Sequence, residues 1–387
     1  MTIFQTQFEE IKKLINYEDF SLLTKRVIDL TLDTENLVYY KKTTELLDWL
    51  DLNTNSKEEI ISRYTSLLDE LYSFLINKPI DSDNNKILIS SYNLIKSYKR
   101  SNFALGPISF TVKEGEIIGL VGENGNGKTT LLRSLCGELQ PTAGEIKYHF
   151  PYRNSYDLRS RLIYIPQRTN SWHGSLLSNL RFTAASYGIV GKENELIVEL
   201  IIARMGLRQY RTYGWKNLSS GYKMRFELAR ALLRRPKLLL IDEPLANLDI
   251  LAQQVVLDDF KDIARSPFRP LGIVLSSQQL YEVEKTSDNV IFLKKGSPKN
   301  IEQDTDVIYK EVSKFIIEFE SSWKQDDLYN ILKQLELEKI QINGGTYVAS
   351  FPANISQDQF LRLVLDQQIP ITYFRNISNS TRRFFLS

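Results

Sequence analysis

Nine consecutive residues carry the clearest chemistry in this sequence. An apolar stretch, residues 117–121, precedes them and a helical pattern of leucines follows them. In such a strand, loop and helix, backbone N–H groups converge on phosphate oxygens, and glycines allow close approach of the backbone. Lys128 would reach the outer phosphates, and Thr129 would offer its hydroxyl to Mg²⁺. The pattern predicts a phosphate-binding loop made of Gly122, Glu123, Asn124, Gly125, Asn126, Gly127, Lys128, Thr129 and Thr130.

Two adjacent carboxylates, Asp242 and Glu243, end a second apolar run, residues 238–241. A continuous apolar run is typical of a central strand in a parallel sheet, and such sheets bind ligands beyond the carboxyl ends of their strands. The two carboxylates are therefore expected beside the phosphate-binding loop. We expect Asp242 to hold Mg²⁺ and Glu243 to polarise an attacking water molecule.

Three further side chains stand where a nucleotide could meet the chain. Gln167 ends a short apolar strand pattern, a place where glutamine is common for structural reasons alone. Tyr98 precedes Lys128 by 30 residues. Its ring could stack on a purine, with an exposed surface position as the alternative. Ser219 precedes a helical pattern, so its hydroxyl is expected to cap that helix.

The elements that must position these residues divide the chain into three parts. Residues 1–84 have apolar side chains at helical spacing and predict a bundle of three or four amphipathic helices, with a structural or partner-docking role. Residues 81–85 are polar and turn-prone, as in a linker. Residues 85–298 predict an α/β domain with helices across 173–212 and from 220 onward. Its strands are expected at 87–94, 104–112, 162–167, 238–241, 272–279 and 290–293.

Residues 299–387 predict a separate α+β domain. Strands are expected at 315–319, 339–342, 347–351 and 371–374, and helices at 326–335 and from the capping residue Ser356 to about 366. The resulting order, β-α-β-β-α-β, suggests a small ferredoxin-like module.

The charge and the hydrophobicity of the sequence argue against nucleic acid as a partner and against direct membrane insertion. With 49 basic and 47 acidic residues, the net charge of +2 provides no overall field that would attract nucleic acid. No apolar run approaches the roughly 18 residues needed to span a bilayer, so we expect no direct membrane insertion and, at a membrane, a spanning partner chain.

The single cysteine, Cys136, lies in the helical pattern after the loop and is expected to pack there. A reducing, cytoplasmic setting fits this cysteine usage.

Residues 87–296 resemble the nucleotide-binding domain of ATP-binding-cassette (ABC) transporters, because seven motifs of that family occur in its order. The first three are Tyr98 at the position of the adenine-stacking aromatic, residues 122–130 as the phosphate loop, and Gln167 at the position of the glutamine that contacts metal and water. The fourth is the signature sequence, which consists of Leu218, Ser219, Ser220, Gly221 and Tyr222. The last three are Asp242 with Glu243, residues 246–249, and residues 276–278 as the switch loop. The resemblance implies an α/β P-loop NTPase of the ABC ATPase type, an ATPase that uses ATP and Mg²⁺.

The resemblance also implies how such a protein works. In this family two cassettes, identical or different, close on ATP. Ser219, Ser220 and Gly221 of one subunit would then meet the nucleotide bound by the other. Closure would move separate transmembrane permease subunits, which would hold the chain at the cytoplasmic face of the cell membrane. The C-terminal segment is similar to the tail of many exporter-type members, so the resemblance implies an exporter.

Two motifs, the signature sequence and the switch loop, depart from the family pattern. Ser220 and Tyr222 replace the commonest glycine and glutamine of the signature, as in exporter-type members. Gln278 stands where the family usually has a histidine that contacts the γ-phosphate, and the histidines of this chain, His149 and His173, lie far away in the sequence. A glutamine amide donates a hydrogen bond but carries no charge. We expect near-normal ATP binding, with hydrolysis that is slow or depends on a partner subunit.

Two alternatives remain open at this point. One is a soluble ABC ATPase that acts on ribosomes or regulates assembly, although translation-type members usually carry two cassettes and this chain has one. The other is an export ATPase for surface polysaccharide, whose usual C-terminal β-sandwich is longer than the tail here. The transported substrate would be selected by the membrane partner and cannot be deduced from this chain.

Overall fold

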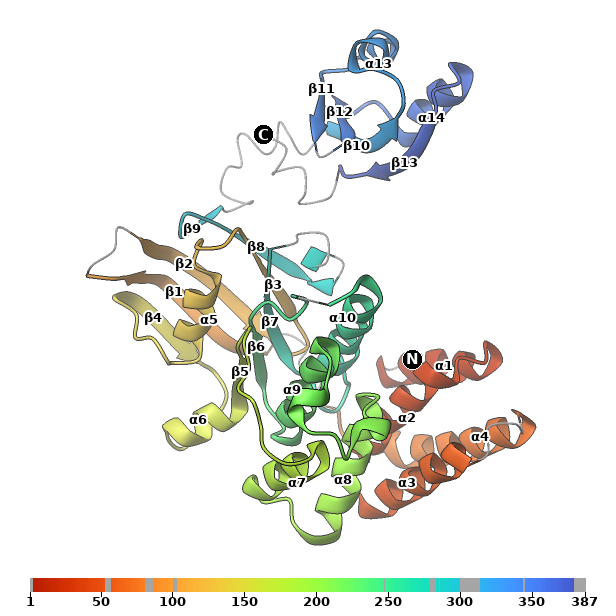
Figure 1. The fold of residues 1–387 in the computed structure, drawn as a ribbon, viewed down its shortest axis with the longest axis vertical. Coiled ribbons are helices and arrows are strands. Elements are labelled where there is room, and N and C mark those ends of the chain that lie inside the picture. Colours follow the sequence, from red (N-terminus) through yellow and green to blue (C-terminus); the bar gives the residue numbers. More distant parts are fainter. Residues whose placement is uncertain are drawn as a thin grey trace. The chain divides into compact units, whose positions relative to one another are not determined.

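The computed structural model describes residues 3–52, 57–80, 86–99, 103–246, 248–278, 283–284, 286–299, 314–343 and 345–378, which fold into two compact units (Figure 1). The first unit comprises residues 1–278 and 286–298, and the second comprises residues 279–285 and 299–387. The predicted boundary near residue 84 therefore does not separate two compact units, whereas the one near residue 298 coincides with a change of unit. Asn247, the predicted linker at 81–85 and the last nine residues lie outside the described part.

A six-stranded sheet in the order β5-β6-β7-β3-β8-β9 forms the centre of the first unit. Neighbouring strands from β5 to β8 pair in parallel. Their carboxyl ends therefore meet at one edge, as the apolar runs predicted. The strands are β3 (Ile117–Val121), β5 (Leu162–Ile165), β6 (Leu238–Ile241), β7 (Gly272–Ser277), β8 (Asn289–Lys294) and β9 (Ser297–Lys299).

A second, antiparallel sheet in the order β2-β1-β4 shares its core with the first sheet. It consists of β1 (Ile87–Ser97), β2 (Ala104–Lys113) and β4 (Ala143–Tyr148). Helix α5 (Lys128–Leu135) contributes Leu131, Leu132 and Leu135 to this core, beside Ile89 of β1 and Leu120 of β3. The apolar face of α5 thus fixes the start of this helix against both sheets.

Helices complete the first unit. They are α6 (Ser155–Arg161), α7 (Leu176–Ser186), α8 (Gly191–Arg204), α9 (Ser220–Leu233) and α10 (Ile250–Ala264), and Ser219 caps α9 as predicted. Cys136 ends α5 and is buried in the shared core, so its predicted packing position is confirmed. Burial also raises the pKa of the Cys136 thiol to about 11.

The N-terminal segment forms four helices, as its apolar spacing predicted. They are α1 (Ile3–Asn16), α2 (Phe20–Thr34), α3 (Leu37–Leu52) and α4 (Lys57–Leu75). Their apolar side chains form one cluster that also includes Phe268, which comes from the segment between α10 and β7. The ring centroids of Phe4 and Phe268 lie 5.3 Å apart. The four helices therefore share their core with the rest of the unit, lying beside α8 and α10 in Figure 1.

Buried charges reinforce this attachment. Arg204 of α8 is fully buried, and its guanidinium donates to Asp29 of α2 at 2.8 Å and to Asp259 of α10 at 2.7 Å. Lys25 of α2 also contacts Asp259, at 2.9 Å. Since a buried charge without a partner is costly, these ion pairs keep α2, α8 and α10 in one arrangement.

The second unit contains one antiparallel sheet in the order β11-β12-β10-β13, packed on two helices. Along the chain its elements are β10 (Lys314–Ser321), α13 (Gln325–Leu332), β11 (Lys339–Asn343), β12 (Thr346–Pro352), α14 (Gln357–Asp366) and β13 (Ile371–Asn376). Ser356 forms a capping box with Gln359 at the start of α14, so its predicted capping role is confirmed.

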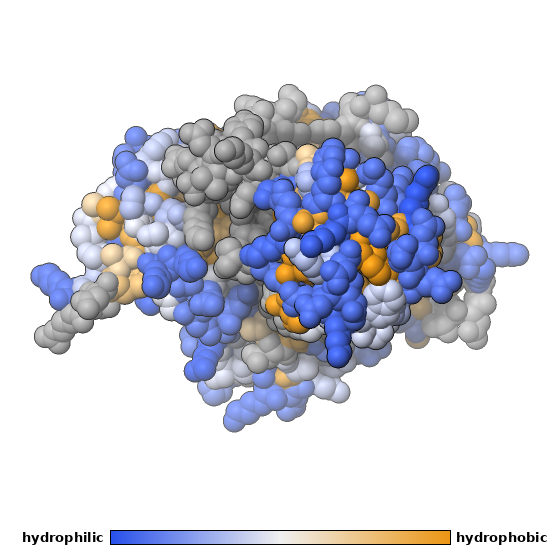
Figure 2. All heavy atoms as spheres, turned by 90° about the horizontal axis from the view of Figure 1, so that it is seen from above, coloured by the Kyte–Doolittle hydropathy of each residue, from blue (hydrophilic) through white to orange (hydrophobic). Residues whose placement is uncertain are grey.

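Within the described residues, no helix has the length and apolar character needed to cross a membrane. The face drawn in Figure 2 is mostly hydrophilic, with hydrophobic residues in small groups between the charged and polar ones.

The buried ion pairs predict a large effect of Asp259→Ala on stability. This substitution leaves two cations, Lys25 and Arg204, short of a partner, and should lower the free energy of unfolding by about 3–5 kcal/mol. Urea denaturation measures the change. The control is Glu59→Ala, which removes an exposed pair with Arg63 and should cost no more than about 1 kcal/mol. Equal effects of the two substitutions would contradict the conclusion that the buried ion pairs hold α2 against α8 and α10.

Candidate functional site

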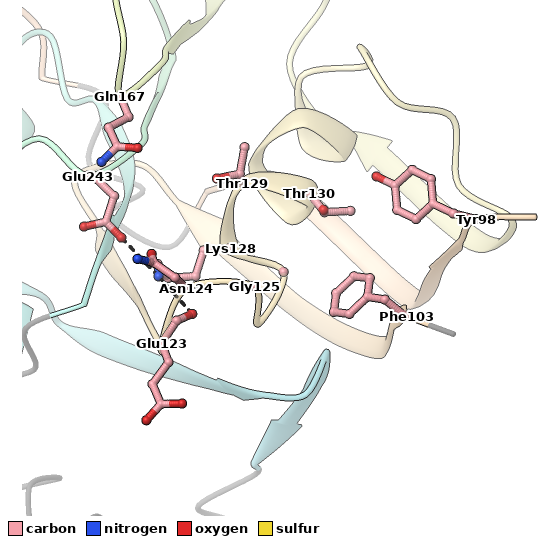
Figure 3. Close-up of a pocket in the computed structure, with 11 residues that line it drawn as sticks. Tyr98, Phe103, Glu123, Asn124, Gly125, Lys128, Thr129, Thr130, Gln167 and Glu243 are labelled. Atoms are coloured by element: carbon pink, nitrogen blue, oxygen red, sulfur yellow. Dashed lines mark hydrogen bonds and ion pairs between the residues drawn. The ribbon is translucent and has the colours of Figure 1, made fainter. Parts of the chain in front are cut away.

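A cavity of about 580 Å³ opens at the carboxyl-terminal edge of the central sheet. Its volume falls within the range of small-ligand sites. The residues that line it come from the segment before β2, the loop after β3, the start of α5 and the segments after β5 and β6 (Figure 3). They are Tyr98, Phe103, Glu123, Asn124, Gly125, Gly127, Lys128, Thr129, Thr130, Gln167 and Glu243.

Two glycines shape the loop under this cavity. Gly127 caps α5 with φ of +100°, and a side chain there would lie within 3 Å of Leu105 and Phe103. Gly122 has no space either, because a Cβ atom would lie 2.5 Å from the carbonyl oxygen of Leu293. The predicted requirement for glycine in this loop thus has two causes, the left-handed backbone of Gly127 and the close packing of both residues.

Lys128 has its ammonium buried at the start of α5, with the side chain 6% exposed. Its Nζ atom donates to the carbonyl oxygen of Gly122 at 2.6 Å and pairs with Glu243 Oε1 at 3.0 Å. Figure 3 shows Glu243 pointing toward Lys128 across the floor of the cavity. A phosphate bound in the loop would compete with Glu243 for the same cation.

Asp242 lies beneath the cavity and is 3% exposed. Its Oδ2 atom accepts a hydrogen bond from Thr129 Oγ1 at 2.7 Å. These two oxygens suit Mg²⁺, a hard cation that prefers oxygen ligands. The described residues contain no group of three or more His, Cys, Asp or Glu side chains that could hold a metal. A site with so few protein ligands fits Mg²⁺, which usually keeps several waters and shares substrate phosphates.

Two aromatic rings form the other end of the cavity. Tyr98 and Phe103 lie on the same side of it, away from Gln167 and Glu243 (Figure 3). Tyr98 was predicted from its distance to the loop, whereas Phe103 was missed. The signal that would have identified Phe103 is an aromatic residue directly before β2, the strand that packs against the phosphate loop through Leu105.

Several predicted residues lie outside the lining of this cavity. Gly122 and Asn126 support the loop instead, and Asn126 Oδ1 accepts a hydrogen bond from the Lys295 backbone N–H at 2.9 Å. Among the described residues, the signature positions and Gln278 do not line the cavity either. Ser219 Oγ accepts from the Tyr222 N–H at 3.4 Å at the start of α9, and Gln278 is exposed after β7. Ser220 and Gly221, the other two signature residues predicted to bind nucleotide, are likewise absent from the lining.

Comparisons with known proteins agree on one family. The family model described as "ABC transporter" matches residues 105–246. "Uncharacterized ABC transporter ATP-binding protein YxlF" of Bacillus subtilis is 32% identical over 212 residues, which cover 54% of this chain and 68% of that protein. "Phosphonates import ATP-binding protein PhnC" of Treponema denticola is 29% identical over 226 residues, covering 54% and 87%.

A solved structure shows a similar fold. It is cbiO1 from Clostridium perfringens, described as part of the ABC transporter complex cbiONQ. The match has a TM-score of 0.51 at 23% identity and covers 58% of this chain and 93% of that one. At this identity the similarity supports the P-loop fold of the cassette alone.

Proposed function

This chain belongs to the ABC transporter family of ATP-binding proteins, and we propose that it is the ATP-hydrolysing subunit that drives separate transmembrane permease subunits. ABC ATPases of this family bind and hydrolyse ATP. The observation that carries the proposal is the meeting of Lys128, Gln167 and Glu243, from three different strand ends, in one cavity with an aromatic end. This arrangement offers separate places for the triphosphate, for an attacking water molecule and for the adenine ring of ATP.

We place the triphosphate on the loop at residues 122–130, with the adenine ring against Tyr98 and Phe103. Stacking of a base on an aromatic ring contributes about 1–3 kcal/mol. Lys128 then neutralises the outer phosphates, and this releases Glu243 from its ion pair with Lys128. The freed carboxylate can accept a proton from the attacking water.

Thr129, Asp242 and Gln167 are the proposed holders of Mg²⁺. When bound, Mg²⁺ neutralises charge on the β- and γ-phosphates. Asp242 keeps its carboxylate buried and directed toward Thr129, so the protein oxygens of the site are in place beforehand. Gln167, from the segment after β5, lines the same cavity as Glu243 and would supply its amide oxygen to the metal.

The proposed active unit is a dimer of cassettes, identical or different. Ser219, Ser220 and Gly221 do not line the cavity of their own subunit, although all three lie in the described part of the chain. They stand at the N-terminus of α9, where the helix dipole favours an anion. We propose that they meet the triphosphate bound by a second cassette.

We further propose that the chain works at the cytoplasmic face of the cell membrane, held there by permease subunits. Export is inferred from Ser220, Tyr222 and the C-terminal segment, whereas PhnC is an importer by its name. The segments 1–84, 85–298 and 299–387 are the proposed functional divisions. They correspond to a helical bundle, the cassette, and a ferredoxin-like module whose strand order β11-β12-β10-β13 supports that classification.

The test uses Glu243→Gln, which removes the carboxylate but keeps the size of the side chain. With ATP and Mg²⁺ this variant should turn over ATP at least about 10²-fold more slowly than wild type. It should also accumulate as a dimer in light scattering, and tagged protein should co-purify with a multispanning protein from its native membrane. Wild-type turnover in the variant would refute the role of Glu243. Co-purification with ribosomal or assembly proteins alone would favour the soluble ABC ATPase instead.

Gln278 gives a second prediction for this chain. If its amide contacts the γ-phosphate, Gln278→Ala should slow hydrolysis, and Gln278→His should raise turnover above wild type by up to about 10²-fold, because a charged imidazole replaces a neutral amide. ATP affinity should change little in both variants. Steady-state turnover at saturating ATP measures the effect, and equal rates for all three proteins would show that Gln278 has no switch role.

A further inference from the structure

Three hydroxyl groups surround the carboxylate of Asp242. Thr129 Oγ1 donates to Oδ2 at 2.7 Å, Tyr164 OH donates to Oδ2 at 3.3 Å, and Ser276 Oγ donates to Oδ1 at 2.6 Å. Thr129 is itself a proposed metal ligand. Tyr164 and Ser276 have no such role, so any effect they have on the metal must act through Asp242.

Ser276 makes a second contact that Tyr164 does not make. While its hydroxyl proton is donated to Asp242, its oxygen accepts the backbone N–H of Glu243 at 2.9 Å. Glu243 has a φ of +49°, a left-handed conformation that is unfavourable for a residue with a side chain. The fully buried hydroxyl of Ser276 on β7 thus fixes both the carboxylate of Asp242 and the strained backbone of the neighbouring Glu243.

The sheet order explains why these residues come together. Strand β6, which ends directly before Asp242, lies between β5 and β7. In register, Tyr164 of β5 pairs with Leu240, and Leu275 of β7 pairs with Ile241, which brings Ser276 level with Asp242. The carboxylate is therefore held from both sides by strands that do not carry it.

Tyr164 acts on Asp242 through its hydroxyl alone. The hydroxyl donates to Oδ2 at 3.3 Å, and an ionised carboxylate can only accept. Groups that orient a metal ligand in this way tune metal affinity, and their loss typically costs about 10–100-fold in affinity or activity.

We propose that Tyr164 and Ser276 are positioning residues for the ATPase reaction. Both orient Asp242 toward Mg²⁺, and Ser276 in addition fixes Glu243 where it can accept a proton from water. This inference rests on the proposed roles of Asp242 and Glu243. It predicts different defects for the two residues, because Tyr164 contacts only the metal-side carboxylate whereas Ser276 contacts both functional residues.

The experiment compares Tyr164→Phe and Ser276→Ala with the control Ser90→Ala. Ser90 is an equally buried serine on β1 whose hydroxyl contacts His149 at 2.8 Å and which lies outside the cavity lining. Mn²⁺ binding in the presence of a non-hydrolysable ATP analogue, followed by electron paramagnetic resonance, reports on Asp242. Turnover at saturating Mg²⁺ reports on Glu243, and nucleotide binding in EDTA reports on an intact loop.

We expect Tyr164→Phe and Ser276→Ala to weaken Mn²⁺ binding by about 10–100-fold with nucleotide binding in EDTA unchanged. At saturating Mg²⁺, Tyr164→Phe should recover wild-type turnover, whereas Ser276→Ala should stay at least about 10-fold slower. Ser90→Ala should match wild type throughout. Because only one ring hydroxyl is removed in Tyr164→Phe, this variant tests the Asp242 contact even if Ser276→Ala folds poorly.

Wild-type Mn²⁺ affinity in Tyr164→Phe and Ser276→Ala would overturn the proposal. So would recovery of Ser276→Ala at saturating Mg²⁺, since that would leave Glu243 independent of Ser276. If wild type itself bound no Mn²⁺ with the analogue, the proposed nucleotide site would fail. If wild type binds Mn²⁺ and both variants bind it with the same affinity, only the positioning roles of Tyr164 and Ser276 are refuted.

Discussion

The buried ammonium of Lys128 is the constraint on which the rest of the site depends. A charge so far from water needs a negative partner, and in this structure it has Glu243 and the carbonyl oxygen of Gly122. The loop around this cation requires glycine because of the left-handed backbone of Gly127 and the close packing of Gly122 and Gly127 against neighbouring residues. In the proposed mechanism phosphate competes with Glu243 for Lys128, so that binding of the substrate and release of the Glu243 carboxylate are one event.

The order of the parallel strands brings the other groups of the candidate site to the edge of the sheet where Lys128 lies. The strands β5, β6, β7 and β3 are neighbours, and each ends at the same edge of the sheet with a different functional group. The loop follows β3, the carboxylates follow β6, Gln167 follows β5, and Gln278 follows β7. None of these groups is near another in the sequence, yet the hydrogen-bonded ladders fix their spacing. Hydroxyls from β5 and β7 then hold Asp242 in place from the strands on either side.

The sequence predicted the parts of this site that are local in the chain. Lys128, Thr129, Asp242 and Glu243 each follow an apolar run that identifies a strand end. Phe103 was missed. Tyr164 and Ser276 were predicted only as part of a strand and of the switch loop, because their contacts with Asp242 follow from the strand order, which apolar periodicity does not encode. Helix α10 and strand β4 were missed as well, and β4 has mostly exposed residues and no buried alternation to reveal it.

The N-terminal helices show a second limit of sequence analysis. Their helical spacing was correctly predicted, but they were expected to form a domain of their own. Instead Asp29 contacts the buried Arg204, and Asp33 is buried against Arg269, with hydrogen-bond distances of 2.8 and 2.6 Å. Charged residues on an amphipathic helix look solvent-exposed until the partner surface is known. These helices are thus an integral part of the first unit.

Calorimetry of MgATP binding to wild type, Lys128→Ala and Lys147→Ala tests the central claim most directly. Lys147 is an exposed lysine on β4 outside the cavity lining and serves as the matched control. Charge-assisted hydrogen bonds contribute about 1.5–3 kcal/mol, so Lys128→Ala should weaken binding by about 10–100-fold while Lys147→Ala binds like wild type. Absence of binding heat in wild type, or equal affinity in all three proteins, would contradict the account.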